Sequence, residues 1–439
     1  MKYAAGIGVI TIVLCAEAVG QSLTWLGTGN QRYSVAFDVS ADGSVVVGFL
    51  TDGAELARAF RWTAATGIQE LGTFGGRGSI AHAVSANGLV IVGEADSADG
   101  ATRAFRWTAQ TGMMDLGTLG TSPTAAYDVS DDGSVIVGAS TGGTFVPMQR
   151  AFRWQAGEMR NISGDRVGEA WGVSGDGSVV VGHMLDPTNL TITAFRWTET
   201  GMQTLGSLPD YGMSRANGVS QDGAVVVGEA MDATGARGRA YRWQYGFGMQ
   251  DLGTLGGGGT NSRALDVSGD GSVVVGAAEV ASGEYRAFRW TQATGMQDLN
   301  VVYASLLRDG SVLGSADGIS PNGRFIVGAG YNARANRLEA YLLDTRGTTS
   351  VEDSPAASPL LRVEPQPVEG QGWVRVQHEG TLERVEVVDV LGRCVAVVGR
   401  GILTFGMASL PLPALPAGIY TVVARAGEAV AAERFVVVR

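Results

Sequence analysis

The sequence predicts an all-β protein: a seven-bladed β-propeller closed by an N-terminal strand, followed by a small C-terminal β-sandwich. Three observations lead to this fold class. The chain contains 66 glycines among 439 residues, more than a helical protein tolerates. One motif recurs every 44 to 52 residues, a period that suits a four-stranded propeller blade. After residue 346 the motif stops and the composition changes, which indicates a second domain.

Residues 1–20 have the layout of a signal peptide. Lys2 precedes an apolar stretch over residues 4–14, and small residues follow it. The stretch is too short to cross a bilayer, so we expect export without a transmembrane span. Cleavage at the small residues would remove Cys15 and leave Cys394 alone, so disulfides are not expected to stabilise the exported chain.

The charge of the chain argues against nucleic acid as a partner. The formal net charge is −11, and the arginines do not gather into a basic stripe. A phosphate backbone requires such a stripe.

Each repeat contains the pattern A-x-x-V-S-x-D-G-S-V-V-V-G, then R-A-F-R-W-T, then T-G-M-x-D-L-G-T. The serine of the first pattern occurs at Ser40, Ser85, Ser130, Ser174, Ser220, Ser268 and Ser320. Four short strands are predicted in each unit, with the Asp-Gly or Asn-Gly pair forming the hairpin turn between the first two.

The pairing of the third and fourth strands can be predicted in the second unit if residues 109–112 form the turn. Three facing pairs result: Arg106–Asp115, Phe105–Leu116 and Trp107–Met114. The four hydrophobic side chains then share one face and the ion pair lies on the other. The same register pairs Arg61 with Glu70, Arg242 with Asp251, and Arg289 with Asp298. Because the pair is repeated, we interpret these arginines as structural.

The seventh unit lacks its fourth strand, since nothing like M-x-D-L-G follows residues 339–345. The segment Leu23–Thr28, "LTWLGT", resembles that missing strand, although it precedes the first unit. We therefore predict that it pairs with the seventh unit and protects the sheet edges. Leu342 replaces the usual arginine and Trp25 the usual acid, so we expect their side chains to touch.

The repeats resemble the HAF family of probable extracellular repeats, whose marks are an "HAFRW"-like segment followed by "MxDLGTLGG". Arg58–Trp62 reads "RAFRW", with arginine in place of the family's histidine, and the second mark is present in residues 113–120 and 249–257. The resemblance covers residues 21–346, implies repeats of the propeller type, and carries no assigned activity.

A linker is predicted over residues 347–359, which are rich in Gly, Ser, Thr and Pro. Residues 360–439 contain alternating strands and four ordered marks: "PQP" at 365–367, "DVLGR" at 389–393, "LPAGIY" at 415–420, and a hydrophobic end at 435–438. This tail is similar to the C-terminal sorting domain of the type IX secretion system, with "PQP" in place of "PNP". The resemblance implies a small β-sandwich that engages the secretion machinery and directs the protein across the outer membrane.

No metal, cofactor or catalytic set is predicted. The three histidines, His82, His183 and His378, lie in separate units without metal-ligand spacing. Segments such as Asp38–Gly43 resemble the start of a calcium loop, but Phe49 stands where its bidentate glutamate belongs, so a hairpin turn is the better interpretation. The turns also lack the aromatic of a sialidase Asp box, and no pair of carboxylates or nucleophile with its base stands out.

One position differs among the repeats, the second residue of A-x-x-V-S. It is occupied by Phe37, His82, Tyr127, Trp171, Asn217, Leu265 and Asp317. We expect this strand to line the central channel, near loops that carry Tyr211, Arg215 and Arg263. Two interpretations stay open. These residues fill the channel, or they form a shallow ligand-binding face from His82, Tyr127, Trp171, Tyr211, Arg215, Asn217, Arg263 and Asp317.

These observations favour an exported, non-catalytic propeller at the cell surface or outside the cell, which binds a glycan or a protein. The alternatives are a secreted propeller enzyme acting on polysaccharide and a purely structural component of the envelope. Carboxylates facing the channel would favour the enzyme, and a smooth apolar channel would favour the structural role.

Overall fold

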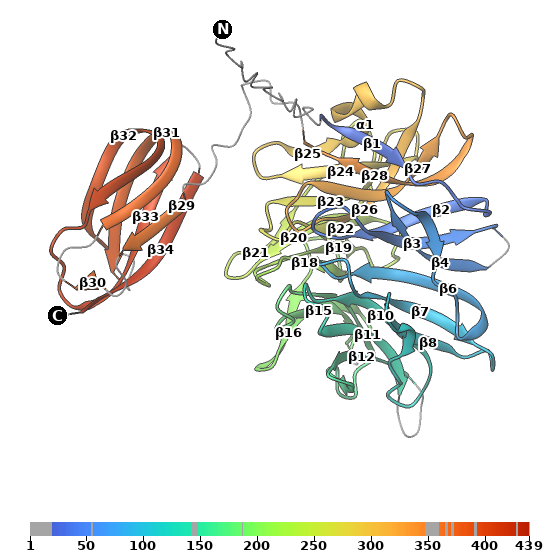
Figure 1. The fold of residues 1–439 in the computed structure, drawn as a ribbon. Coiled ribbons are helices and arrows are strands. Elements are labelled where there is room, and N and C mark those ends of the chain that lie inside the picture. Colours follow the sequence, from blue (N-terminus) through green and yellow to red (C-terminus); the bar gives the residue numbers. More distant parts are fainter. Residues whose placement is uncertain are drawn as a thin grey trace, which may run out of the picture. The chain divides into compact units, whose positions relative to one another are not determined.

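The computed structural model describes residues 20–53, 56–142, 148–186, 188–346, 360–364, 368–369, 373–389, 393–426 and 429–438. Residues 1–19 of the predicted signal peptide and the predicted linker, residues 347–359, lie outside the described residues. The chain divides into two compact units after Arg346 (Figure 1).

Seven four-stranded antiparallel sheets are present among the described residues of the first unit. In six of them the strands follow one another in the sequence. The first sheet contains β2 (Tyr33–Val39), β3 (Val46–Thr51), β4 (Ala57–Thr63) and β5 (Gly67–Glu70); the second, β6 (Gly75–Val84), β7 (Ile91–Ser97), β8 (Thr102–Thr108) and β9 (Gly112–Asp115); the third, β10 (Thr121–Val129), β11 (Val135–Gly142), β12 (Met148–Gln155) and β13 (Glu158–Asn161).

The next three sheets repeat this order. The fourth contains β14 (Gly168–Val173), β15 (Val180–Leu185), β16 (Ile192–Thr198) and β17 (Gly201–Gly206); the fifth, β18 (Met213–Val219), β19 (Val225–Met231), β20 (Gly238–Gln244) and β21 (Gly248–Asp251); the sixth, β22 (Ser262–Val267), β23 (Val273–Glu279), β24 (Tyr285–Thr291) and β25 (Gly295–Asp298). A short helix α1 (Leu299–Val302) and a 3₁₀ turn (Ala304–Leu306) then lead to the seventh sheet.

The seventh sheet combines strands from both ends of this unit. β26 (Val312–Ile319), β27 (Phe325–Asn332) and β28 (Arg337–Asp344) pair in order, and β1 (Ser22–Trp25) pairs with β28 as the fourth strand. The Leu26 backbone N–H then donates to the Ala340 carbonyl oxygen at 2.9 Å, as Leu71 does to Ala59 in the first sheet. The predicted pairing of the N-terminal segment with the seventh unit is confirmed.

The predicted register of the third and fourth strands is wrong by one residue. Phe105 lies opposite Asp115, and Arg106 lies opposite Met114. The hairpin loop has three residues instead of four, because Gly112 adopts φ 66° and pairs with Thr108. The other expected pairs shift likewise: Arg61 faces Gln69, Arg242 faces Gln250 and Arg289 faces Gln297.

The shift changes the partners of both arginines in the repeat. Asp115 Oδ2 lies 3.3 Å from Nη1 of Arg103, the first arginine of the motif. The second arginine reaches the next sheet: Nε of Arg153, Arg196 and Arg242 donates to the carbonyl oxygens of Gly177, Gly223 and Gly271 at 3.2, 3.0 and 3.2 Å. These contacts support the structural interpretation of the arginines, but with different partners.

The hydrophobic side chains also separate onto two faces. Phe105 and Trp107 pack with Met113 between the first and second sheets, whereas Leu116 packs between the second and third. Trp25 likewise faces Tyr341, with ring centroids 6.1 Å apart, and Leu342 faces Thr24. The expected contact between Trp25 and Leu342 is therefore wrong, since the two side chains lie in different hydrophobic clusters.

The innermost strand of every sheet contains a β-bulge at the position that varies among the repeats. In the first sheet, Ala36 pairs with Gly48 and Asp38 with Val47, which leaves Phe37 unpaired. The register of the other six inner strands shifts at the equivalent residue. Gly48 is required opposite the bulge, because a Cβ there would lie 2.0 Å from the Val35 carbonyl oxygen. A bulge leaves the extra residue without a partner on the neighbouring strand and changes the direction of its side chain. Strand pairing therefore does not determine which amino acid occupies this position.

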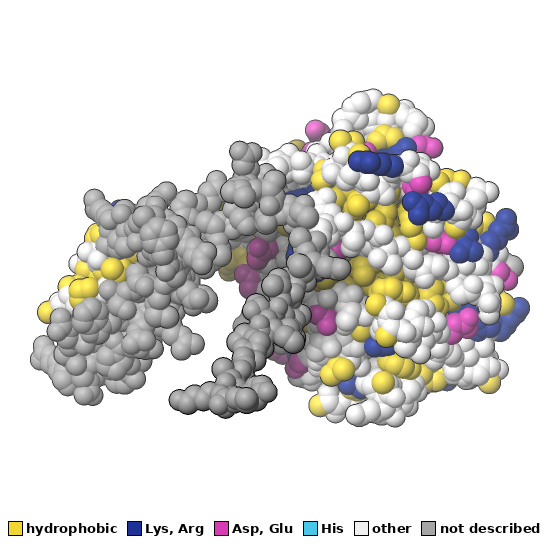
Figure 2. All heavy atoms as spheres, turned by 45° about the horizontal axis from the view of Figure 1, so that its top comes forward, with side chains coloured by type: hydrophobic (Ala, Val, Ile, Leu, Met, Phe, Trp, Pro, Cys, Tyr) yellow, Lys and Arg dark blue, Asp and Glu magenta, His cyan; other side chains and the backbone are white. Residues whose placement is uncertain are grey.

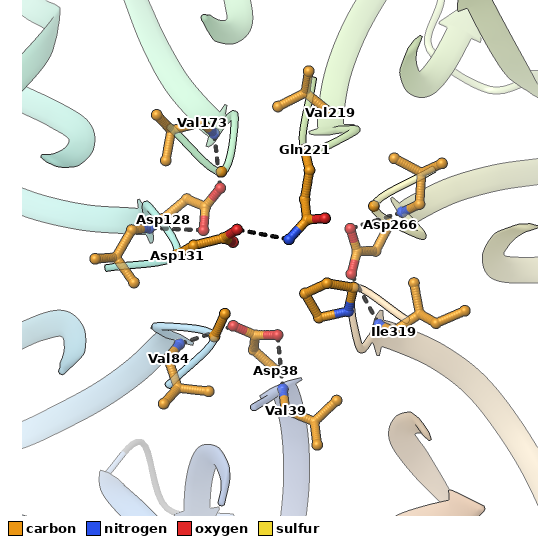
Figure 3. Close-up of a pocket in the computed structure, with 16 residues that line it drawn as sticks. Asp38, Val39, Val84, Asp128, Asp131, Val173, Val219, Gln221, Asp266 and Ile319 are labelled. Carbon is orange, nitrogen blue, oxygen red and sulfur yellow. Dashed lines mark hydrogen bonds between the residues drawn. The ribbon is translucent and has the colours of Figure 1, made fainter. Parts of the chain in front are cut away.

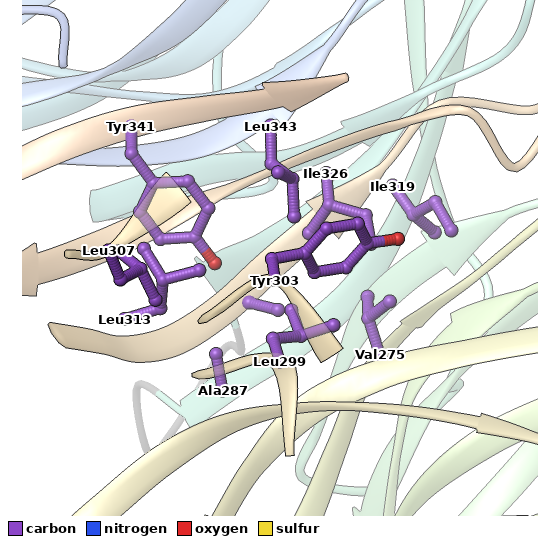
Figure 4. Close-up of a cluster of buried hydrophobic side chains, with 11 residues drawn as sticks. Val275, Ala287, Leu299, Tyr303, Leu307, Leu313, Ile319, Ile326, Tyr341 and Leu343 are labelled. Carbon is purple, nitrogen blue, oxygen red and sulfur yellow. The ribbon is translucent and has the colours of Figure 1, made fainter. Parts of the chain in front are cut away.

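The seven inner strands neighbour one another in turn, from β2 to β26, and β26 contacts β2. Hydrophobic clusters fill the spaces between neighbouring sheets, which is the arrangement of a β-propeller. Figure 4 shows the cluster between the sixth and seventh sheets, to which the sixth sheet contributes Val275 and the seventh contributes Ile326 and Tyr341. No helix among the described residues is long and apolar enough to cross a membrane.

In the second unit, the described strands belong to one six-stranded sheet. Its strands are β29 (Leu360–Glu364), β30 (Val368–Glu369), β31 (Trp373–Asp389), β32 (Cys394–Pro411), β33 (Gly418–Ala426) and β34 (Ala429–Val438). β31 pairs with β29 near its start and with β33 near its end, and β29 also contacts β34. The predicted β-sandwich stays a prediction for this unit. The motif "PQP" at 365–367 lies outside the described residues.

Candidate functional site

Bulged residues of the first four sheets form a continuous run of rings, which we call the aromatic arc. The centroid distances between neighbours are 5.7 Å for Phe37–His82, 5.3 Å for His82–Tyr127 and 5.0 Å for Tyr127–Trp171. Trp171 is 39% exposed, and its Nε1–H donates to Glu169 Oε2 at 2.8 Å. The arc brings together His82, Tyr127 and Trp171, three residues that the sequence proposed for one site.

The fifth to seventh sheets contribute a group of charged side chains, Arg215, Glu229, Arg263 and Asp317, which we call the charged arc. Arg215 lies opposite Glu229 in the fifth sheet. Burial raises the pKa of Glu229, while Arg263 and Arg215 oppose the rise. In the seventh sheet, burial raises the pKa of Asp317 to about 6, and Ser315 Oγ donates to its carboxylate at 2.6 Å. Arg215, Arg263 and Asp317 therefore belong to one electrostatic group.

His183 lies where the two arcs meet. Its ring centroid is 6.1 Å from that of Trp171, and burial together with the nearby Arg215 lowers its pKa to about 4. The imidazole is therefore neutral at pH 7.

Two of the proposed site residues have other partners. The Asn217 side-chain amide donates to the Ala264 carbonyl oxygen at 2.7 Å and joins the fifth sheet to the sixth. Tyr211 packs against the hydrophobic cluster between the fourth and fifth sheets, and its ring carries the Arg237 guanidinium at 5.8 Å. No contact in the described part of the chain joins Tyr211 to either arc.

Three aspartates that sequence reasoning did not select face one another in the channel. Asp38, Asp128 and Asp266 each immediately follow a bulged residue and point toward the channel axis (Figure 3). Each carboxylate accepts the N–H of the following residue at 2.7 Å and the N–H of Val84, Val173 or Ile319 in the next sheet at 2.8 Å. A sequence signal existed, since the other four units have Ala83, Gly172, Gly218 and Gly318 here.

These aspartates surround a cavity of about 90 Å³. Burial is the main cause that raises the pKa of Asp128 and of Asp266 to about 7. Burial also raises the pKa of Asp38 well above its usual range, and repulsion from Asp266 and Asp128 adds to the rise. Gln221 Nε2 closes the neighbouring rim by donating to Asp131 Oδ2 at 2.6 Å. These carboxyl groups therefore keep a proton to a higher pH than an exposed aspartate does.

The Asp-Gly segments are hairpin turns, as predicted. Asp42 Oδ1 accepts the Ser40 hydroxyl at 2.8 Å and the Ser44 N–H at 2.9 Å, while Gly43 takes φ 73°. These hydrogen bonds lower the pKa of Asp42. Among the residues with described positions, no three His, Cys, Asp or Glu side chains are grouped to hold a metal ion.

Comparison with known proteins gives a fold-level likeness only. No family model matches the chain, and no curated protein matches it. The similar solved structures include TolB from Acinetobacter baumannii, with 14% identity, a TM-score of 0.41, and coverage of 66% of this chain and 77% of that one. An oligogalacturonate lyase in complex with manganese has 13% identity, a TM-score of 0.46, and coverage of 74% and 96%.

A third neighbour is the β-propeller domain of the Trilobed protease from Pyrococcus furiosus, with 12% identity, a TM-score of 0.44, and coverage of 60% and 80%. Since neighbours with enzyme names occur in this set, the likeness favours neither a catalytic nor a non-catalytic role. The fold description rests on the sheets themselves: the regular secondary structure of the described residues is almost entirely β, and the seven four-stranded sheets of the first unit have the arrangement of a β-propeller.

Proposed function

We propose that the protein is an exported, non-catalytic, seven-bladed β-propeller closed by β1, which binds a glycan or a protein through the channel-lining arcs. The observation that supports it most is the aromatic arc at the bulged position. Contacts between sheets repeat from unit to unit, whereas this position carries a different side chain in each of the seven sheets. A residue that the pairing does not constrain is available for recognition.

The chemistry of the two arcs suits an amphipathic ligand. Trp171 offers a partly exposed ring, and ring faces bind apolar surfaces of sugars or of protein side chains. Arg215 and Glu229, on neighbouring strands of the fifth sheet, supply a donor and an acceptor. A structural component that only fills its channel would not need paired charges there, because buried charges cost free energy unless they are compensated.

The proposal is tested with the double variant Trp171→Ala, Tyr127→Ala in the full chain. Glycan-array and pull-down measurements should find a ligand for the wild type and lose it in the variant. Leu265→Ala is the matched control, because it changes the bulged position of the sixth sheet outside the aromatic arc. Equal binding by the double variant, or equal loss in the control, would rule out the aromatic arc as the site.

Export through the type IX system is a separate proposal, supported by the leader and the ordered tail motifs. Deletion of residues 360–439 should trap the protein in the periplasm of its native host while the propeller remains folded. Cell fractionation and surface proteolysis measure this outcome. Normal surface delivery of the truncated chain would contradict the sorting role.

The enzyme alternative draws on the channel aspartates, since a pKa of about 7 suits proton transfer. We do not favour it, because both oxygens of each carboxylate already accept backbone N–H groups. Release of reducing ends from a polysaccharide by wild type, lost in Asp128→Asn, would replace the binding proposal with an enzyme.

A further inference from the structure

A groove between the fourth and fifth sheets lies away from both arcs. The strands of each sheet alternate in direction, so the hairpin turns after the first and third strands lie at the same end of the sheet. The groove is formed by such turns: Ser178 and Asp222 follow inner strands, and Thr198 and Tyr245 belong to outer hairpins. Its volume is about 600 Å³, within the usual range for small-ligand sites.

The outer hairpin of the fifth sheet departs from the repeat. In four other hairpins two threonine hydroxyls hydrogen-bond across the turn at 2.7–2.8 Å, as Thr108 does with Thr111. The fifth hairpin instead reads Gln244-Tyr-Gly-Phe-Gly248. Tyr245 is 63% exposed and Phe247 is 84% exposed, so neither ring is needed for packing between sheets. Exposed aromatic side chains at one turn mark a contact surface.

The polar groups beside Tyr245 have unused hydrogen-bonding capacity. Arg196 lies over the Tyr245 ring, 5.6 Å from its centroid, and its Nε donates to the Gly223 carbonyl oxygen at 3.0 Å. In the third and fifth sheets the equivalent arginine also donates from Nη1 to a glutamine, as Arg242 does to Gln244 at 2.8 Å. Thr198 stands in that glutamine's place, so Nη1 and Nη2 of Arg196 have no partner among the described residues.

Asp222 offers the complementary acceptor. Its Oδ1 accepts Ser220 Oγ at 2.6 Å and the Ala224 N–H at 2.9 Å, while Oδ2 has no hydrogen-bond partner in the described parts of the chain. Those bonds, with Arg196 nearby, lower the pKa of Asp222, so the carboxylate is ionised at neutral pH. The groove therefore places free N–H donors and a free carboxylate oxygen beside an aromatic ring.

We propose that this groove binds a neutral oligosaccharide, with one sugar ring packed on Tyr245 and its hydroxyls bonded to Arg196 and Asp222. A sugar hydroxyl both donates and accepts, which matches a guanidinium next to a carboxylate. At the edge of the groove, Glu199 forms an ion pair with Arg160 at 2.8 Å. With Arg196 and Asp222, the local charge is therefore balanced, so an acidic glycan gains no advantage. A protein anchor would need a deeper apolar pocket than Tyr245 and Val179 provide.

The test uses the full chain and calorimetric titration with neutral hexose oligomers of six units: maltohexaose, cellohexaose and mannohexaose. We expect at least one to bind, and Tyr245→Ala to weaken that binding about tenfold or more, a change equivalent to about 1.4 kcal/mol. Tyr245→Phe should retain it, because the ring remains. Phe247→Ala is the matched control, since it removes an exposed ring that does not line the groove.

Two further measurements separate this site from the channel. The double variant Trp171→Ala, Tyr127→Ala should leave the oligosaccharide affinity of the groove unchanged. This holds whether or not the variant loses binding of a ligand to the aromatic arc. Melting temperatures should stay within about 2 °C for the Tyr245 variants, because exposed side chains contribute little to stability. The proposal is overturned if none of the three oligomers binds, if Tyr245→Ala binds equally well, if only an acidic oligomer binds, or if Tyr245 instead mediates self-association.

Discussion

We call the contact between two neighbouring sheets a joint. At the joint of the first and second sheets and at that of the seventh and first sheets, one serine hydroxyl bonds to both partners in the same way, and we call this arrangement the clamp. At the first–second joint, Ser79 Oγ accepts the Ala59 N–H at 3.0 Å and donates to the Gly72 carbonyl oxygen at 2.7 Å. At the seventh–first joint, Ser34 Oγ accepts the Ala340 N–H at 2.9 Å and donates to the Gly27 carbonyl oxygen at 2.6 Å. One joint lies within continuous sequence and the other connects the two ends of the unit.

The joints differ in what accompanies the clamp. Asp38 accepts the Val84 N–H at the first–second joint. At the seventh–first joint Gly318 takes the aspartate's place, since a Cβ there would lie 2.4 Å from the Phe37 carbonyl oxygen. The Asn322 side chain donates instead to the Ala41 carbonyl oxygen at 2.8 Å.

The outer strand pair differs too. The second sheet uses the partly exposed Arg103–Asp115 ion pair, whereas Trp25 packs edge-on against Tyr341 in the seventh. A partly exposed ion pair contributes about 0–1 kcal/mol, less than burial of an aromatic side chain. A strand that no hairpin connects to its neighbour loses more entropy on pairing, so the stronger contact lies where the chain is discontinuous.

The largest effect is expected from Trp25→Asp. The change removes the ring from the cluster around the fully buried Tyr341 and places a carboxylate beside it. We expect a loss of about 2–4 kcal/mol in the free energy of unfolding, measured by urea denaturation. Adding Leu342→Arg should not recover the loss, because Leu342 faces Thr24 on the other side of the strand. Recovery by that second change would contradict the observed register.

A pH titration should distinguish the joints that contain an aspartate. Asp128 and Asp266 have a pKa of about 7 in the folded state and about 4 when unfolded, so the folded state binds more protons between these values. The stability they contribute is complete below about pH 4 and is lost as the pH rises through 7. Asp42, whose folded pKa is lowered, acts oppositely and loses its contribution in stronger acid.

The free energy of unfolding should therefore increase as the pH falls from 8 to 5, by on the order of 2–3 kcal/mol for each of Asp128 and Asp266. Asp266→Asn should remove the part of this pH dependence of the free energy of unfolding that comes from Asp266. Asp42→Asn, which alters a turn aspartate with a lowered pKa, is the matched control and should leave the slope intact. A flat wild-type profile would show that the channel carboxylates remain ionised.

The clamp itself is tested by Ser34→Ala and Ser79→Ala. Each change leaves one buried N–H and one carbonyl oxygen without the serine hydroxyl, which costs about 1–3 kcal/mol. We expect the two losses to agree within about 0.5 kcal/mol, because the geometry is the same. A clearly greater loss for Ser34→Ala would mean that the seventh–first joint depends more on its clamp.

The smallest effect is expected from Arg103→Gln. The ion pair with Asp115 is 3.3 Å long and about one third exposed on each side, so its loss should cost less than about 1 kcal/mol. Arg153→Gln is the comparison, because Nε and Nη2 of Arg153 donate to the Gly177 carbonyl oxygen of the next sheet. It should destabilise the protein more than Arg103→Gln.

Repetition within the sequence determined the four strands of each unit, the Asp-Gly hairpin turns, and the pairing of residues 22–25 with the seventh unit. These features follow from local pattern, because a missing strand leaves a gap that only a matching segment fills. Variation at one repeat position selected His82, Tyr127 and Trp171, and the structure places these three rings next to one another. Their role in binding stays a prediction.

Only the tertiary structure decided the register and the contacts across joints. A three-residue loop followed by a glycine with positive φ differs by one residue from a four-residue loop. That single step changed the predicted partners of Arg61, Arg106, Arg242 and Arg289. The channel aspartates were missed for a related reason. Asp38, Asp128 and Asp266 become neighbours only when the sheets surround a common axis, and their raised pKa values arise from burial there, which no stretch of sequence specifies locally.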